Sequence, residues 1–206
     1  MSKPGLLLIG AGGHAKSCID VIEQQNEFQI IGLVGSSNEV GTRVLGYEVL
    51  GIDDDLPELM KFAPFALISV GQIGINDLRS NLFSKILNLG FTSPVVTSPS
   101  AYVSHHAVVG KGTVIMHQAI INAGASIGSN CIINSKVLVE HDVVVEDNCH
   151  IATGAIINGG SSVGRSSFIG SGSRIRESIS IGTMCVIGMG VIIRHDVPAI
   201  SQFVGD

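Results

Sequence analysis

The sequence predicts a chain of two parts, a small α/β domain with a parallel sheet followed by a parallel β-helix. Two observations predict it. From Val103 to Ile193 every sixth residue is Ile or Val, without a missed step. Before residue 90 this period is absent, and short apolar segments alternate with segments of helical spacing. The boundary is expected in the proline-containing segment around residue 92, which divides the chain into residues 1–92 and 93–206.

The amino-terminal part alternates strand and helix. Ala15, Ile19 and Ile22 follow the i, i+4, i+7 spacing of one helix face. The other expected elements are strands at 6–9 and 30–34, a hairpin at 46–47, a helix at 56–62, a strand at 65–70 and a helix at 76–89. Strands that alternate with helices imply a parallel sheet with helices on its faces.

The six-residue period fits neither an α-helix nor a flat amphipathic strand. It is the repeat of a parallel β-helix, in which short strands join at corners and one apolar residue per side points inward. With three sides to a coil, residues 18 apart stack about 4.8 Å apart along the axis. Cys131, Cys149 and Cys185 fall in a column of small residues on one side. We expect them to be buried filler, as free cysteines often are.

A glycine-rich loop, Gly10-Ala11-Gly12-Gly13-His14, separates the first strand from the first helix. This is the usual place for a phosphate, which free N–H groups and the helix dipole hold. The loop lacks the third glycine of the dinucleotide motif, and Gly35-Ser36 stands where that motif wants an acid after the second strand. NAD binding is therefore disfavoured, and a tight turn without a ligand is the alternative.

Histidines gather in the repeat part. His105, His141 and His195 share one register but lie two and three coils apart, so they cannot share one metal ion. His141 stands between Glu140 and Asp142, the arrangement of a general base whose imidazole a carboxylate orients. A solvated corner histidine is the other interpretation.

Bulk properties exclude several classes of protein. The formal net charge is -5 with scattered Lys and Arg, which gives no case for nucleic acid. Mean hydropathy is +0.46, yet no apolar run approaches the roughly 18 residues of a membrane span. The start of the sequence has no secretory pattern. We therefore expect a soluble, cytoplasmic protein without membrane or nucleic-acid partners.

Three segments, GAGGHAK, IINSKVLVEHD and NCHIATGAIINGG, together resemble the bacterial sugar O-acyltransferase family. That family includes nucleotide-linked amino-sugar N-acetyltransferases and sialic acid O-acetyltransferases. The resemblance implies a Rossmann-like domain joined to a left-handed β-helix and assembled as a homotrimer. Acetyl-CoA would bind along the groove between neighbouring β-helices, and each active site would draw on two subunits. No metal is expected.

The resemblance also implies roles for single residues. His141 matches the catalytic base, Asp142 the adjacent carboxylate and Asn134 an active-site asparagine. The expected acetyl-CoA contacts are His150, Gly159, Ser171 and Met189, and the expected nucleotide-gripping loop is Gly10, Gly12, Gly13 and His14. The implied activity moves acetyl to the amino group of a nucleotide-linked 4-amino-deoxysugar, a UDP-sugar, in bacterial surface glycan biosynthesis. No cysteine of the repeat is placed as a nucleophile, which favours direct transfer.

Two segments depart from the pattern of that family. Gly35-Ser36 replaces an acidic pair, and Gly71-Gln72-Ile73-Gly74 stands where amino-sugar enzymes often have Gly-Asp-Asn. An O-acetyltransferase acting on a sialic-acid-like hydroxyl would need the same base and the same cofactor, so it stays open as the close alternative. A zinc carbonic anhydrase would need a third histidine where Glu146 stands. An ice-binding β-helix would need regular Thr rows, which the sequence lacks.

Overall fold

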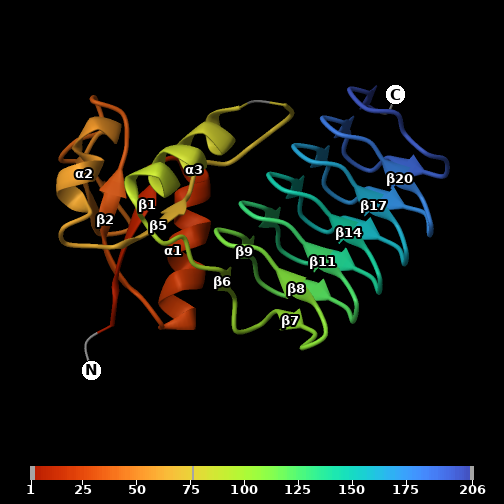
Figure 1. Ribbon diagram of the computed structural model, residues 1–206, viewed down its shortest axis with the longest axis horizontal. Coiled ribbons are helices and arrows are strands. Elements are labelled where there is room, and N and C mark those ends of the chain that lie inside the picture. The colour runs from red at the N-terminus through yellow and green to blue at the C-terminus, as the bar shows by residue number, and fades with distance from the viewer. Residues whose placement is uncertain (1–2, 76, 205–206) are drawn as a thin grey trace.

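The computed structural model describes residues 3–75 and 77–204, and it shows the α/β domain and the β-helix packed against each other (Figure 1). The strands of the α/β domain are β1 (Gly5–Ile9), β2 (Gln29–Val34), β3 (Arg43–Val44), β4 (Tyr47–Gly51) and β5 (Phe65–Ile68). Its helices are α1 (Gly13–Gln25), α2 (Leu56–Leu59) and α3 (Leu78–Leu89), with a 3-10 turn η1 at Asp53–Asp55. Among the described residues no helix is long and apolar enough to cross a membrane.

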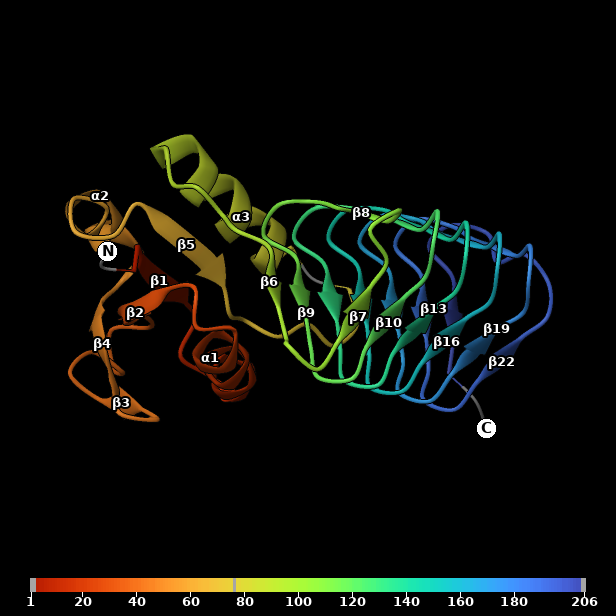
Figure 2. The same ribbon diagram turned by 90° about the horizontal axis from the view of Figure 1, so that it is seen from below.

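The sheet of the α/β domain has the order β3-β4-β2-β1-β5, and its pairs are parallel except for the β3–β4 hairpin. Helix α1 covers one face, and α2 and α3 cover the other (Figure 2). Along β1, Leu6 and Leu8 pack with α1, whereas Leu7 and Ile9 pack with α2 and α3. A parallel sheet with both faces covered needs such a continuous apolar strand. The expected parallel sheet and hairpin are thus confirmed.

One strand end differs from expectation. The strand expected to reach Val70 ends at Ile68, although the Ser69 N–H still donates to the carbonyl oxygen of Ile9 in β1. The Ser69 hydroxyl donates to the carbonyl of Gly10, and the Val70 carbonyl accepts from Arg79 rather than from a neighbouring strand.

The two later helices are also shorter than expected. Helix α2 ends at Leu59, and residues 60–63 continue as irregular turns before Pro64, which disfavours helix in the residue before it. Helix α3 begins at Leu78, and residue 76, where we expected its start, lies outside the described residues.

Three sheets of two-residue strands form the walls of the β-helix, and we name them by what their outward side chains meet. The domain-facing sheet contains β6 (Val96–Thr97), β9 (Val114–Ile115), β12 (Ile132–Ile133), β15 (His150–Ile151), β18 (Phe168–Ile169), β21 (Val186–Ile187) and β23 (Gln202–Phe203). The apolar-faced sheet contains β7 (Tyr102–Val103), β10 (Ile120–Ile121), β13 (Leu138–Val139), β16 (Ile156–Ile157), β19 (Arg174–Ile175) and β22 (Ile192–Ile193). The serine-rich sheet contains β8 (Val108–Val109), β11 (Ser126–Ile127), β14 (Val144–Val145), β17 (Ser162–Val163) and β20 (Ser180–Ile181).

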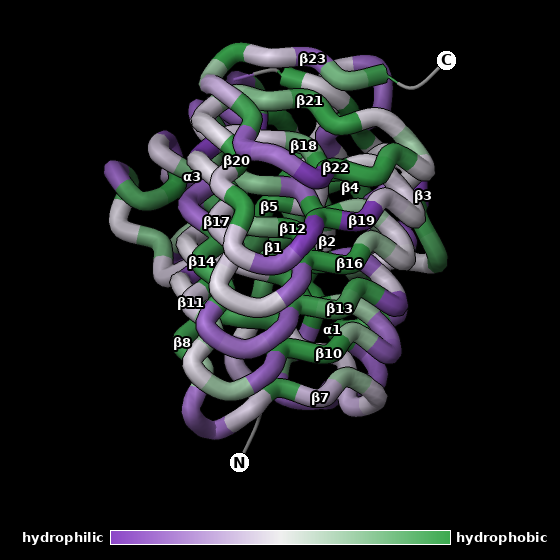
Figure 3. The backbone as a smooth tube through the Cα atoms, turned by 90° about the vertical axis from the view of Figure 1, so that its right-hand side faces the viewer, coloured by the Kyte–Doolittle hydropathy of each residue, from purple (hydrophilic) through white to green (hydrophobic). Residues whose placement is uncertain are grey.

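The coil length agrees with the sequence. Ile121 pairs in parallel with Val139, and Val139 with Ile157, so each coil takes 18 residues. From β7 to β22 the second residue of each strand points inward, and these residues form one continuous core. Figure 3 shows hydrophobic residues recurring at the strands. The three cysteines of the repeat are buried in that core, as expected.

Each corner of the β-helix between residues 110 and 191 turns on one residue with left-handed backbone. Every sixth residue from 112 to 190 has a positive φ, and these positions include Asn130, Asp142 and Asn148 beside glycines. Asn and Asp tolerate this conformation because their short polar side chains can bond locally. The backbone conformation of each such corner therefore fixes where the polar side chains of that corner lie.

The two domains share a hydrophobic core. Val96, Val114 and Ile132 face outward from the domain-facing sheet, yet they are buried in one cluster with Ile19 and Ile22 of α1. Thr92 bridges to Phe65, and Val96 already pairs with Val114, so these pairings lie on either side of the expected division at residue 92. This packing sets the α/β sheet directly beside the β-helix.

Candidate active site

A cavity of about 990 Å³ lies where β1, β2, β4 and β5 end. Its walls come from the glycine loop, from Gly35 and Ser36 after β2, from the turn after β4, from residues 70–73 after β5, and from His150 of the β-helix. Ligands of open α/β sheets bind in this crevice outside the carboxyl ends of the strands. The cavity therefore lies where a nucleotide would be expected, and the β-helix closes one side of it.

The glycine loop forms an anion-binding wall. Gly10 has φ +115°, and a Cβ there would lie 2.5 Å from Cγ2 of Val70, so no other residue fits. Helix α1 begins at Gly13 directly after the loop, and its first turn carries no acidic side chain. The free N–H groups and the helix dipole therefore favour a negative group here.

Two histidines, buried His150 and half-buried His14, line this cavity. The Nδ1 of His150 donates to the Gln72 carbonyl oxygen at 2.6 Å, because a carbonyl can only accept. The Nε2 of a neutral His150 then accepts from the Asn134 amide at 3.3 Å. Burial lowers the pKa of His150 to about 4. His150 is thus a neutral ring in a fixed tautomer.

His14 lies beside it, with ring centroids 6.5 Å apart. Burial, with smaller contributions from the charges of Arg79 and His150, lowers the pKa of His14 to about 3. Its Nε2 is buried without a hydrogen-bond partner among the described residues. A buried polar atom without a partner is costly, so this nitrogen is available to a ligand in the cavity.

Arg79 of α3 ties the cavity wall to the β-helix. Its guanidinium is buried, and it donates to the carbonyl oxygens of Val70 at 2.5 Å and Asn130 at 3.0 Å and to Oδ1 of Asn130 at 2.9 Å. Asn130 in turn donates to Oδ1 of Asn148, one coil further. The sequence analysis missed Arg79, because a single arginine in an amphipathic helix gives no signal of burial.

His141 and Asp142 form a pair on a different corner of the β-helix. The Nδ1 of His141 lies 2.9 Å from Oδ2 of Asp142, and both side chains are exposed. The hydrogen bond that Nδ1–H of His141 donates to the Asp142 carboxylate raises the pKa of His141 above its ordinary value. Because Nδ1 faces the carboxylate, Nε2 is the nitrogen that can take a proton. This is the geometry of an oriented general base.

Glu140, the other flanking carboxylate, has a different set of contacts. One of its oxygens accepts from the Asn122 amide at 2.9 Å and from the backbone N–H of His141 at 3.2 Å. It therefore braces the corner backbone beneath the imidazole, while Asp142 holds the ring itself.

Six of the site residues expected from the sequence lie on the two corners that border the apolar-faced sheet, whereas His150 lies on the domain-facing sheet and the glycine loop lies in the α/β domain. Asn134, Ser171 and Met189 lie on the corner between the domain-facing and apolar-faced sheets, which we call the Asn134 corner. His141, Asp142 and Gly159 lie on the corner between the apolar-faced and serine-rich sheets, which we call the His141 corner. Within one chain, Asn134 contacts His150 and not His141.

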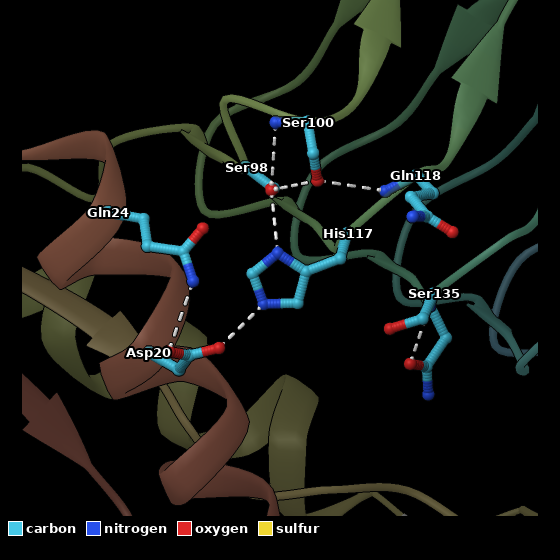
Figure 4. Close-up of polar contacts among 8 residues, drawn as sticks. Asp20, Gln24, Ser98, Ser100, His117, Gln118 and Ser135 are labelled. Carbon is cyan, nitrogen blue, oxygen red and sulfur yellow. Dashed lines mark hydrogen bonds and ion pairs between the residues drawn. The ribbon is translucent and has the colours of Figure 1, made fainter.

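A second polar cluster links the domains, as Figure 4 shows. His117 lies between Oδ2 of Asp20 in α1, at 2.8 Å from Nε2, and the hydroxyl of Ser98, at 2.7 Å from Nδ1. Serine, histidine and aspartate in a row suggest a nucleophile. However, Ser98 is 1% exposed and also contacts Ser100, so the cluster is an interdomain link.

The described residues contain no group of three or more His, Cys, Asp or Glu side chains that could hold a metal ion. His105 and His141 lie two coils apart in one column, as the pairing of Tyr102 with Ile120 and of Ile120 with Leu138 requires. The expected acetyl-CoA-dependent chemistry uses no metal.

Three family models match the sequence. The PglD N-terminal domain matches residues 5–86, the bacterial transferase hexapeptide model (six repeats) matches residues 106–141, and the hexapeptide repeat of succinyl-transferase matches residues 161–194. Among curated proteins, an uncharacterized protein L142 of Acanthamoeba polyphaga mimivirus is 28% identical over 126 residues, which are 61% of this chain. The matched segment covers 24% of that longer protein.

Solved structures match nearly the whole chain. PerB from Caulobacter crescentus, in complex with CoA and GDP-perosamine, is 32% identical, covers 99% of this chain and 95% of its own, and has a TM-score of 0.91. The acetyltransferase domain of PglB from Neisseria gonorrhoeae, in complex with acetyl coenzyme A, is 29% identical, with coverages of 99% and 97% and a TM-score of 0.89. WeeI from Acinetobacter baumannii is 25% identical, with coverages of 97% and 96% and a TM-score of 0.84.

These matches agree with the geometry of both domains. The PglD model spans the domain that carries the glycine loop, and the hexapeptide models span the coils that carry the His141 corner. The chain belongs to the family of sugar acetyltransferases in which a PglD-type amino-terminal domain precedes a left-handed β-helix of hexapeptide repeats.

Proposed function

We propose that the protein transfers the acetyl group of acetyl-CoA to the amino group of a nucleotide-linked 4-amino-deoxysugar. The observation that carries the proposal is that one chain has both a cavity at the carboxyl ends of the sheet, lined by the glycine loop, and a histidine whose Nδ1 faces a carboxylate. The ligands of the Caulobacter structure, CoA and a nucleotide-linked amino sugar, support it. So does the acetyl coenzyme A of the Neisseria structure.

The chemistry follows from the state of His141. A sugar amine attacks the thioester only when it is neutral, and it must lose a proton as the new bond forms. Nε2 of His141 takes that proton, the N–C bond forms, the C–S bond breaks, and the proton passes to the departing CoA sulfur. The charge of Asp142 stabilises the protonated imidazole in between, since it already raises the pKa of His141.

The cavity suits a nucleotide diphosphate. The glycine loop and the start of α1 offer N–H groups to the diphosphate, and the turns after β2 and β4 leave room for the base and ribose. His14 and His150 line the cavity as neutral rings and would act through hydrogen bonds. We expect a nucleoside-diphosphate sugar, and UDP and GDP are the two nucleotides to compare.

We propose that the active chain is a homotrimer assembled through the apolar-faced sheet. Its outward residues include Tyr102, Ile120 and Ile192, which are 57%, 41% and 50% exposed. The corresponding outward positions of the serine-rich sheet include Ser126, Ser162 and Ser180. A sheet face that presents large apolar side chains to water favours a protein partner.

Such an assembly would also complete the active site. The Asn134 and His141 corners border opposite edges of the apolar-faced sheet, so a cyclic contact turns the His141 edge of one copy toward the Asn134 edge of the next. Acetyl-CoA would then bind in the groove between two copies. It would contact Gly159 on one side, and Ser171, Met189 and His150 on the other. We place this reaction in the cytoplasm.

The first test measures thiol release from acetyl-CoA. The acceptors are GDP- and UDP-linked 4-amino-4,6-dideoxysugars and a free sialic acid, offered in separate reactions with the full chain. Turnover with an amino sugar supports the proposal, and the better nucleotide names the substrate. Turnover with the sialic acid alone would instead establish hydroxyl acetylation, the alternative that the same base permits.

The second test concerns assembly. Replacing Ile120 by Asp sets a charge on the apolar-faced sheet and is expected to dissociate the trimer in sedimentation experiments. Val144→Asp is the matched control, because Val144 is 44% exposed on the serine-rich sheet. If both variants sediment as the wild-type protein does, the apolar-faced sheet is not the interface.

A further inference from the structure

One column of side chains runs along the His141 corner. Its members are the residues two positions after each inward residue of the apolar-faced sheet, and they stack one coil apart. The column reads His105, Ala123, His141, Gly159, Glu177 and His195. Gly159 is therefore the neighbour of His141 on the next coil, and it is the single glycine of this column.

The imidazole of His141 lies against Gly159. A Cβ built on Gly159 would lie 2.6 Å from Nε2, 2.7 Å from Cε1 and 3.2 Å from Cδ2 of His141. Contacts below about 3.0 Å do not occur between such atoms, so even alanine at this position would displace the ring. The space beside Gly159 is filled by the Nε2 edge of the His141 imidazole, with Nε2 and Cε1 nearest.

Backbone conformation does not explain this glycine. Gly159 is absent from the residues with left-handed φ, whereas its neighbour Gly160 has φ +68° and supplies the turn of the corner. A glycine with positive φ is explained by the backbone conformation of its turn. A glycine with an ordinary φ is instead explained by a neighbouring group that leaves no room for a side chain. The feature that uses this space is the ring of His141.

We propose that Gly159 is a positioning residue that seats the imidazole of His141. The inference rests on the proposed role of His141 as the base. An exposed histidine can rotate freely about two bonds, and two contacts restrain this one. Asp142 holds Nδ1, and the missing side chain of Gly159 leaves room for the Nε2 edge of the ring on the next coil.

This role differs from a backbone contact with acetyl-CoA, which the resemblance implies for Gly159. The substitution Gly159→Ala keeps the N–H and C=O groups and adds only a methyl group. A loss caused by the ring appears in kcat and in the ionisation of His141. A loss caused by a weaker cofactor contact appears in KM for acetyl-CoA.

The test compares Gly159→Ala with the wild-type chain by turnover and by NMR titration of His141. We expect kcat to fall by about tenfold or more, a part of the 10²–10⁴ that a general base contributes. We expect KM for acetyl-CoA to stay within about twofold. The pKa of His141 is expected to fall toward its ordinary value, because a displaced ring loses the Asp142 hydrogen bond that raises it. Ala123→Gly, one coil away on the other side, is the matched control and should behave as wild type.

A double variant distinguishes displacement of the His141 ring from a general destabilising effect of Gly159→Ala. Once His141→Ala has removed the ring, Gly159→Ala should cost nothing further, either in residual turnover or in the unfolding midpoint. An unchanged kcat and pKa in the single variant would overturn the proposal, as would a raised KM with kcat intact. If the wild-type chain acetylates none of the offered sugars, the proposed function fails, yet the NMR titration still decides whether Gly159 seats the ring.

Discussion

Acid should destabilise this protein through the two histidines of the cavity. Folded His14 and His150 have pKa values lowered by burial to about 3 and about 4, whereas both titrate near 6.5 once unfolded. Between these values the unfolded chain binds more protons, so stability is lost as the pH falls below about 6.5. At about pH 5 the unfolded pKa lies roughly 1.5 units above the pH, which makes each histidine cost about 2 kcal/mol.

Urea denaturation at about pH 7.5 and about pH 5, at one protein concentration, measures this loss. Other groups titrate as well, and the raised pKa of His141 acts in the opposite direction. The informative quantity is therefore the difference between wild type and His150→Gln, since the glutamine side chain is polar but does not titrate. We expect the wild-type chain to lose about 2 kcal/mol more than the variant. His105→Gln removes an exposed histidine and should leave the loss unchanged.

Equal losses of stability would refute a neutral His150 in the folded chain. If wild type and His150→Gln lose equal stability between the two pH values, His150 is not held neutral in the folded chain. The cavity would then present a charged ring to its ligand, and the hydrogen-bonding role given to His150 would have to be abandoned.

Four further outcomes are expected. Arg79→Met should lower the free energy of unfolding in urea by about 2–4 kcal/mol. The loss of several charge-assisted hydrogen bonds outweighs the gain from no longer burying a charge. An unchanged unfolding midpoint would contradict the stabilising role of the Arg79 contacts with Val70 and Asn130. His141→Ala should lower kcat by roughly 10²–10⁴ with KM nearly kept, and near-full turnover would remove His141 from the mechanism. Asp142→Asn removes the cause of the raised pKa of His141, so the acid limb of the pH–rate profile should move to lower pH, and an unmoved limb would speak against the pair. Ile157→Ala, in the β-helix core, should cost about 2–5 kcal/mol, whereas Val144→Ala, outward-facing on the serine-rich sheet, should cost much less; equal losses would contradict the register.

Much of the fold could be predicted from residue spacing. The six-residue period leaves a single way to point every Ile and Val of the ladder inward, so the coil length and the buried column of Cys131, Cys149 and Cys185 followed directly. Element ends were less certain. Beyond the end of β5, the Ser69 hydroxyl bonds to Gly10 and the Val70 carbonyl to the buried Arg79, contacts that the local pattern does not encode.

The candidate site could likewise be predicted only in part. The contact of His141 with Asp142 was predictable, because adjacent residues on a corner can reach each other whatever surrounds them. The contact of Asn134 with His150 joins two coils, and the bond from His150 to Gln72 joins two domains, so neither could be foreseen from spacing alone. The role of Arg79 was equally hidden, because its burial depends on how α3 packs on the β-helix.

The sequence by itself determined a β-helix of 18-residue coils behind an α/β domain with a glycine loop, because periodicity and local turns are properties of neighbouring residues. Only the tertiary structure decided that the β-helix closes one side of the cavity and that His14 and His150 lie there as neutral rings. It also decided that the expected site residues border two edges of one apolar sheet face. Burial and long-range contacts set these features, since desolvation and shared hydrogen bonds arise only when distant segments pack together.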